Sequence, residues 1–154
     1  MAVFTKINYS DISKIENLFN LGKIRKFEGI KQGIENTNYL IFIKKKKYIL
    51  TIFEKRVDSK DLPFFMKLMS RLSKLKIKCP QPVKNKKGSF IFKVKNKKAC
   101  IVSFLSGTDK KELSNSDCFS VGKNMSMGCG FVLEGSMVPK MQLKVRISST
   151  PLIV

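Results

Sequence analysis

The chain has 154 residues, 43% of them hydrophobic, with a mean hydropathy of −0.10 and a formal net charge of +20. This composition predicts a soluble globular protein with one domain, or with one lobe and part of a second. It argues against a membrane-spanning protein, because no apolar run approaches the roughly 18 residues that a span requires. The N-terminus has no basic head followed by an apolar segment, so we expect no secretory signal and a cytoplasmic location.

The positive charge would attract nucleic acid, an anionic membrane face or a phosphate-bearing metabolite. Arginine is the residue best suited to bidentate phosphate contacts, but it occurs only four times, and the lysines are scattered along the whole chain. We therefore interpret the charge as a lysine-rich solvated surface, and we expect neither a membrane nor a nucleic-acid partner. A small basic nucleic-acid-binding protein is the alternative that the charge leaves open.

The four cysteines stand far apart, and the chain contains no histidine that could complete a metal site. We expect reduced thiols and no metal bound by cysteine. The cysteines are Cys79, Cys100, Cys118 and Cys129.

Near the N-terminus, apolar residues at helical spacing predict a first helix from Asp11 to Leu21. Ser10 would cap its N-terminus and Gly22 would end it. Its apolar stripe, which we assign to the core, consists of Ile12, Ile15, Leu18 and Phe19.

Three strands are predicted next, at Phe27–Ile30, Tyr39–Ile43 and Tyr48–Phe53, with a charged turn at Lys44–Lys47. The connection between the first two strands contains two glycines four residues apart, within residues 29–33. Glycine permits a close backbone approach, so this connection is a candidate phosphate lid. The simpler alternative is a hairpin turn that needs glycine.

A second helix is predicted after the third strand, with Asp61 as its cap, Pro63 in its first turn and Pro80 beyond its end. The predicted buried face of this helix consists of Phe65, Leu68, Met69, Leu72 and Leu75.

The next segment predicts two further strands. Residues 79–83 form a stiff entry to a hairpin, Asn85–Gly88 its turn and Phe90–Val94 its return strand. After a turn at Asn96–Lys98, the last strand is predicted at Ala99–Leu105. These elements indicate an α+β fold with an antiparallel sheet. A kinase-like small lobe would have this pattern, and any other α+β sandwich fits it equally well.

Four motifs in one register carry a more specific resemblance: GIKQGIENTNYLIF, YILTIFEKRVDSKDLPFFMKLMSRL, CPQPV and IVSFLSG. Together they resemble the N-terminal lobe of bacterial homoserine kinases, which belong to the aminoglycoside phosphotransferase and choline kinase-like superfamily. The resemblance covers residues 1–127. It implies a protein-kinase-like small lobe at residues 1–105, with about five antiparallel strands packed on one main helix and an extra N-terminal helix. Residues 106–127 would be the hinge and the start of the C-terminal lobe.

The resemblance also implies a nucleotide site. Backbone amides between Gly29 and Gly33 would cover the phosphates, and residues 103–105 would meet the adenine ring. Thr51 stands where the wider kinase superfamily has a basic residue on the third strand, with Lys55 and Arg56 just beyond it. The full set of expected nucleotide-binding residues is Gly29, Lys31, Gln32, Gly33, Asn36, Asn38, Thr51, Ser103, Phe104 and Leu105.

For function, the resemblance implies ATP-dependent phosphorylation of L-homoserine to O-phospho-L-homoserine in threonine biosynthesis, with Mg²⁺ as the metal. The family's catalytic loop and metal-binding aspartate have no counterpart in this sequence, and residues 128–154 depart from the family pattern. We expect a frame shift or a broken gene near Met127, and a chain that binds nucleotide without turnover. A lobe that only associates with a partner chain is a further alternative. The sequence leaves the homoserine-binding residues and the oligomeric state undetermined.

Overall fold

The computed structural model describes residues 3–31, 35–54, 60–75, 77–107, 114–116, 118–120 and 122–123. The chain divides into two compact units, Met1–Leu105 and Ser106–Val154. In the second unit, the described residues between 115 and 123 are helical. Several predictions fall outside the described residues, namely those on Gln32, Gly33, Lys55, Arg56, Cys129 and residues 128–154.

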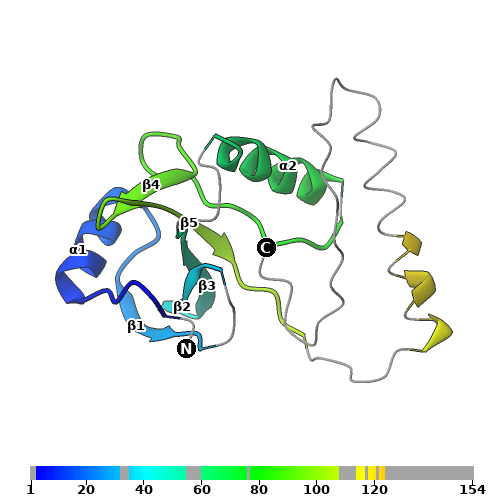
Figure 1. Ribbon diagram of the computed structural model, residues 1–154, viewed down its shortest axis with the longest axis horizontal. Helices are drawn as coiled ribbons and strands as arrows, with labels where there is room; N and C mark the ends of the chain where they lie inside the picture. Colours follow the sequence, from blue (N-terminus) through cyan, green and yellow to red (C-terminus); the bar gives the residue numbers. More distant parts are fainter. Residues whose placement is uncertain are drawn as a thin grey trace. The chain divides into compact units, whose positions relative to one another are not determined.

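The first unit contains a five-stranded antiparallel sheet in the order β1-β2-β3-β5-β4 (Figure 1). This confirms the predicted sheet of about five strands. The strands are β1 (Ile24–Gly29), β2 (Thr37–Ile43), β3 (Lys46–Ile52), β4 (Ile91–Val94) and β5 (Lys97–Ser103).

Most strand boundaries differ from prediction, because pairing with the neighbouring strand decides them. β1 begins at Ile24, earlier than the predicted Phe27, because Ile24 pairs with Ile43 at the far end of β2. β5 ends at Ser103 instead of Leu105, because Ser103, opposite Tyr48, is the last residue of β5 that pairs with β3.

Both tight hairpin turns use residues with positive φ. Lys44 (φ 53°) turns β2 into β3, and Lys95 and Asn96 (φ 48° and 64°) turn β4 into β5. Such left-handed conformations match the twist of the flanking strands in a two-residue hairpin. The turns are therefore shorter than the predicted Lys44–Lys47 and Asn96–Lys98, and their last lysines belong to strands.

The predicted hairpin between residues 79–83 and β4 does not form. Instead Pro82 pairs with Val102, and the N–H of Val83 donates to the carbonyl of Ile101 at 2.9 Å. This segment therefore follows β5 beyond the end of the short strand β4. The predicted turn Asn85–Gly88 is confirmed, because the N–H of Gly88 donates to the carbonyl of Asn85 at 2.9 Å.

Helix α1 (Tyr9–Leu18) begins and ends earlier than predicted. Its cap is Asn8 rather than Ser10, because Asn8 and Asp11 exchange hydrogen bonds as a capping box. The helix ends before the predicted Leu21, since the backbone of Phe19 is extended.

Helix α2 (Leu62–Lys74) has Pro63 in its first turn, as predicted, but Asp61 makes no capping side-chain hydrogen bond. Of the predicted buried face, only Met69 is buried; the other buried residues of α2 are Leu62 and Met66. The helix is apolar on more than one side, so periodicity could not identify which side faces inward.

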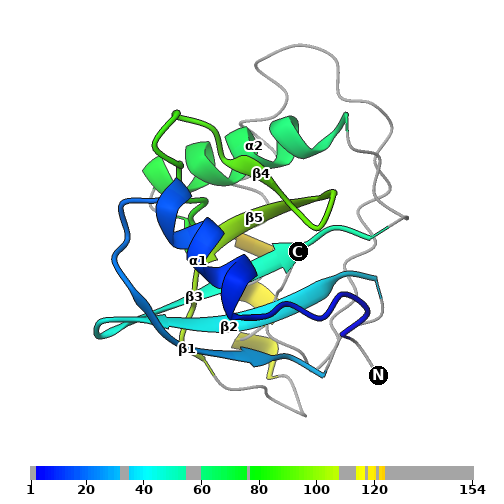
Figure 2. The same ribbon diagram turned by 90° about the vertical axis from the view of Figure 1, so that its left-hand side faces the viewer.

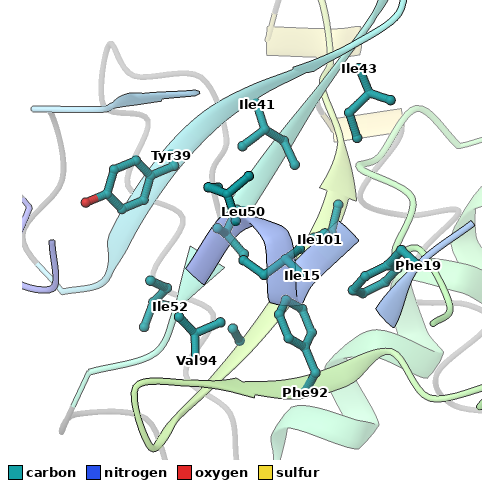
Figure 3. Packing of buried hydrophobic residues seen from close by; sticks show 12 residues of the cluster. Ile15, Phe19, Tyr39, Ile41, Ile43, Leu50, Ile52, Phe92, Val94 and Ile101 are labelled. Atoms are coloured by element: carbon teal, nitrogen blue, oxygen red, sulfur yellow. The ribbon is translucent and has the colours of Figure 1, made fainter. Parts of the chain in front are cut away.

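The hydrophobic core lies between α1 and the sheet (Figure 3). Because side chains alternate along a strand, every second residue of β2 and β3 points toward α1. Helix α2 lies on the other side of the sheet, near β4 and β5 (Figures 1 and 2). The buried core cluster consists of Ile12, Ile15, Phe19, Tyr39, Ile41, Ile43, Leu50, Ile52, Phe92, Val94, Ala99 and Ile101.

Candidate nucleotide-binding site

On the face of the sheet opposite the core, two polar residues lie side by side on neighbouring strands. We call Asn38 of β2 and Thr51 of β3 the polar row; Asn38 pairs with Thr51, which in turn pairs with Cys100 of β5. The Oγ1 of Thr51 donates to Oδ1 of Asn38 at 2.8 Å. Both polar side chains are buried, with exposures of 5% and 3%. The structure thus brings together two of the predicted nucleotide-binding residues, and the hydroxyl proton of Thr51 is already engaged.

The β1–β2 connection is described at its two flanks, Gly29–Lys31 and Asn36–Asn38. On the first flank, the N–H of Ile30 donates to the carbonyl of Asn38 at 2.9 Å, and Lys31 is exposed. On the second flank, Oδ1 of Asn36 accepts from the backbone N–H of Glu54 at 3.3 Å. The predicted residues of these flanks therefore lie beside the polar row, at the same end of the sheet.

Gly29 is explained by packing. A Cβ atom at this position would lie 2.9 Å from Cγ2 of Val3 and 3.5 Å from Cε1 of Tyr39. A Cβ atom 2.9 Å from Cγ2 of Val3 would clash with it, so only a glycine at position 29 lets the chain near the N-terminus pack this closely against β1. Its predicted role toward phosphate stays a prediction.

Residues 103–105 continue from β5 at the other end of the sheet. The N–H of Ser103 donates to the carbonyl of Gln81 at 2.9 Å, and the N–H of Phe104 donates to the carbonyl of Lys47 at 3.2 Å. Within the described residues, the N–H of Leu105 donates to no other group. Of the three predicted adenine contacts, Leu105 is therefore the one with an uncommitted backbone donor.

The two halves of the predicted site lie on neighbouring strands. Thr51 pairs with Cys100, and Ser103 follows three residues later along β5. Three residues of strand span roughly 10 Å. The end of β5 and the polar row are thus roughly 10 Å apart and do not form one compact cluster, so one ligand would have to be elongated to contact both.

One polar cluster was missed by sequence reasoning. Oε1 of Glu54 accepts from the hydroxyls of Thr5 at 2.7 Å and Thr37 at 2.8 Å, while Lys97 forms an ion pair with Oε2. We call these four residues the Glu54 cluster. Burial raises the pKa of Glu54, but the hydrogen bonds from Lys97, Thr5 and Thr37 and the charge of Lys97 outweigh it and lower the pKa below 4.5. No local signal marks the cluster, because its members come from four separate segments.

The three described cysteines are free thiols, as predicted. Burial raises the pKa of Cys100 to about 12 and also raises that of Cys79, so neither thiol is poised to ionise. Among the described residues, no group of three or more His, Cys, Asp or Glu side chains is arranged to hold a metal ion. The described helices also include none of the length and apolar character needed to cross a membrane.

A five-stranded antiparallel sheet with helix α1 on one face and helix α2 on the other is the architecture of a protein-kinase-like small lobe with an extra N-terminal helix. The sequence model of the phosphotransferase enzyme family matches residues 26–125. The chain belongs to this family.

Its sequence relatives include the homoserine kinase of Rhodopseudomonas palustris (strain BisB18), which is 36% identical over 126 residues. The homoserine kinase of Brucella ovis has the same identity over the same length. Each alignment covers 82% of this chain and 39% of the relative, so the chain spans about two fifths of the curated proteins that it matches.

Solved structures show the same fold at low sequence identity. Spectinomycin phosphotransferase in complex with ADP and spectinomycin aligns with a TM-score of 0.65 and 15% identity, over 87% of this chain and 40% of the other. Its AMP-bound complex aligns with a TM-score of 0.58 and 15% identity, over 77% of this chain and 36% of the other. These likenesses confirm the predicted kinase-like architecture.

Proposed function

We propose that this chain provides the nucleotide-binding lobe of a homoserine kinase. The complete enzyme would transfer the γ-phosphoryl group of MgATP to the side-chain hydroxyl of L-homoserine, in threonine biosynthesis. The observation that supports this most strongly is the 36% identity, over 126 residues, to proteins named homoserine kinase. Because the chain spans 39% of those proteins, we assign nucleotide binding to this chain and binding of the acceptor L-homoserine only to the complete enzyme.

Phosphoryl transfer depends mainly on positioning and on electrostatic stabilisation of the phosphates. In this proposal, backbone amides of the flanks Gly29–Lys31 and Asn36–Asn38, with Gln32 and Gly33 between them, meet the phosphates. The N–H of Ile30 is excepted, because it donates to the carbonyl of Asn38. The polar row supports the flanks from the sheet. The N–H of Leu105, which donates to no group among the described residues, would bond an acceptor nitrogen of the adenine ring. Spectinomycin phosphotransferase, which shares this fold, binds ADP and AMP.

The described residues do not fit a Mg²⁺ site. Mg²⁺ prefers carboxylate oxygens together with phosphate oxygens, and the carboxylate of Glu54 is already engaged by Lys97 and two hydroxyls. The resemblance assigns the metal-binding aspartate and the catalytic loop to a part of the fold with no counterpart here. We therefore propose that this chain holds the nucleotide, and that the metal is held by the part of the complete enzyme outside the resemblance.

Calorimetric titration of the chain with ADP tests the nucleotide site. We expect saturable binding, and we expect Leu105→Pro to weaken it about 3- to 10-fold, because proline removes the backbone N–H and one net hydrogen bond. Leu105→Ala is the matched control, since it shortens the side chain but keeps the N–H, and it should bind ADP nearly as the unmodified chain does. Absence of ADP binding would refute the proposed function, and equal affinities for the two variants would refute the role of Leu105.

The acceptor is tested at the level of the gene. The coding DNA would be sequenced from the codon of Ser120 onward and read in all three frames. If one frame supplies the family's catalytic loop, its product should release ADP from ATP when L-homoserine is added, and much less with L-serine. If no frame does so, the homoserine assignment loses its support and only binding functions remain.

A further inference from the structure

The chain near the N-terminus contacts both flanks of the β1–β2 connection. At the first flank, Val3 fills the space beside Gly29 where a Cβ would otherwise lie. At the second flank, the N–H groups of Phe4 and Thr5 both donate to Oγ1 of Thr37 at 3.0 Å. Residues 3–5, which we call the N-terminal segment, therefore tie the two ends of the connection to each other.

Glu54 holds the second flank from the end of β3. Its carboxylate accepts from Thr5 and Thr37, its backbone N–H donates to the side chain of Asn36, and Lys97 neutralises it from β5. The hydroxyl of Thr37 thus accepts two backbone N–H groups and donates to the carboxylate. Thr37 is fully buried, at 0% exposure, so its bonds cannot be exchanged for water.

This arrangement fixes position more than it adds stability. A partly exposed ion pair such as Glu54–Lys97 gains little net free energy, because solvent screens the charges and desolvation offsets part of their attraction. Its bonds are directional, however, and they join four segments that are far apart in the sequence. Sites that bind a charged ligand need such supporting contacts, since small displacements of the binding groups weaken the interaction.

We propose that Thr37 and Glu54 are positioning residues for the nucleotide phosphates. Together with the N-terminal segment, they hold the flanks Gly29–Lys31 and Asn36–Asn38 at the separation at which backbone amides of these flanks, other than that of Ile30, meet the phosphates. This inference rests on the proposed function, which gives those flanks their role in phosphate binding. Neither residue needs to touch the nucleotide, since both act through the backbone of the flanks.

The test compares the affinities of the full chain for ATP and for adenosine, which lacks phosphates. Thr37→Val removes the hydroxyl with little change in volume, and we expect it to weaken ATP binding about tenfold. Adenosine binding should change less than about twofold, because the end of β5 is unaffected. Glu54→Gln keeps an oxygen for the two threonine hydroxyls but loses the charge attraction to Lys97, so it should weaken ATP binding by an intermediate factor.

A purely structural role would lower the melting temperature without changing the ratio of the two affinities. Asp11→Asn is the control, because Asp11 caps α1 and lies 3.4 Å from Lys95 but contacts neither flank. It should leave the ratio unchanged.

The inference is overturned if folded Thr37→Val binds ATP as the unmodified chain does, or if Asp11→Asn shifts the ratio equally. If Thr37→Val fails to fold, Glu54→Gln decides by the same criterion. If the unmodified chain binds no ATP, the proposed function and this inference fall together; if it binds ATP and both variants match it, only the inference falls.

Discussion

At the scale of single residues, Glu54 makes the stability of the lobe depend on pH. Its pKa is lowered in the folded state, because the hydrogen bonds and charge of its partners outweigh the effect of burial. A carboxyl group of this kind contributes stability above its unfolded pKa, and that contribution is lost as the pH falls through the folded pKa. We therefore expect the free energy of unfolding to decrease below pH 4.5, and to decrease less in Glu54→Gln.

Urea denaturation at a series of acidic pH values measures this effect. Lys97→Met should also reduce the pH dependence, because Lys97 supplies one of the hydrogen bonds and the charge that lower the pKa of Glu54. Identical pH profiles for the unmodified chain and Glu54→Gln would show that the carboxylate is not coupled to folding.

At the scale of elements, the buried side of α2 should contribute more to the free energy of unfolding than its exposed apolar side. Met66 is only 3% exposed, whereas Leu75, just past the helix, is 37% exposed and Phe64 is 44% exposed. We expect Met66→Ala to lower the free energy of unfolding by about 2–4 kcal/mol, because it leaves a cavity. Leu75→Ala should cost less, about 1 kcal/mol, since the side chain of Leu75 is partly exposed and less buried area is lost. Chemical denaturation of both variants checks the difference, and a larger cost for Leu75→Ala would restore the side that periodicity predicted.

At the scale of the whole molecule, the net charge of +20 leaves nucleic-acid binding open as an alternative to the phosphotransferase function. A chain that used this charge to bind nucleic acid through 6–10 phosphate contacts would lose about 10³- to 10⁵-fold in affinity between about 50 and 200 mM salt. We expect the chain to bind unrelated nucleic acids only weakly at the higher salt concentration, while ADP binding persists there. Parallel titrations with ADP and with an arbitrary oligonucleotide make the comparison. Tight oligonucleotide binding without ADP binding would favour the alternative.

The sequence by itself determined the elements that depend on neighbouring residues. β2 and β3 follow from runs of β-branched and aromatic residues, α2 from its apolar periodicity and Pro63, and the turn at residues 85–88 from Asn and Gly. The resemblance then supplied the arrangement of these elements, which the comparisons confirm as a phosphotransferase lobe.

Only the tertiary structure decided the contacts between residues distant in the sequence. Pairing along β5 placed residues 81–83 beside it rather than beside β4, and the sheet selected which side of α2 is buried. Likewise, the packing of Val3 against Gly29 and the Glu54 cluster join residues whose separation along the chain hides their proximity. Propensity and periodicity describe a few consecutive residues, so they carry no information on which distant polar groups satisfy one another once water is excluded.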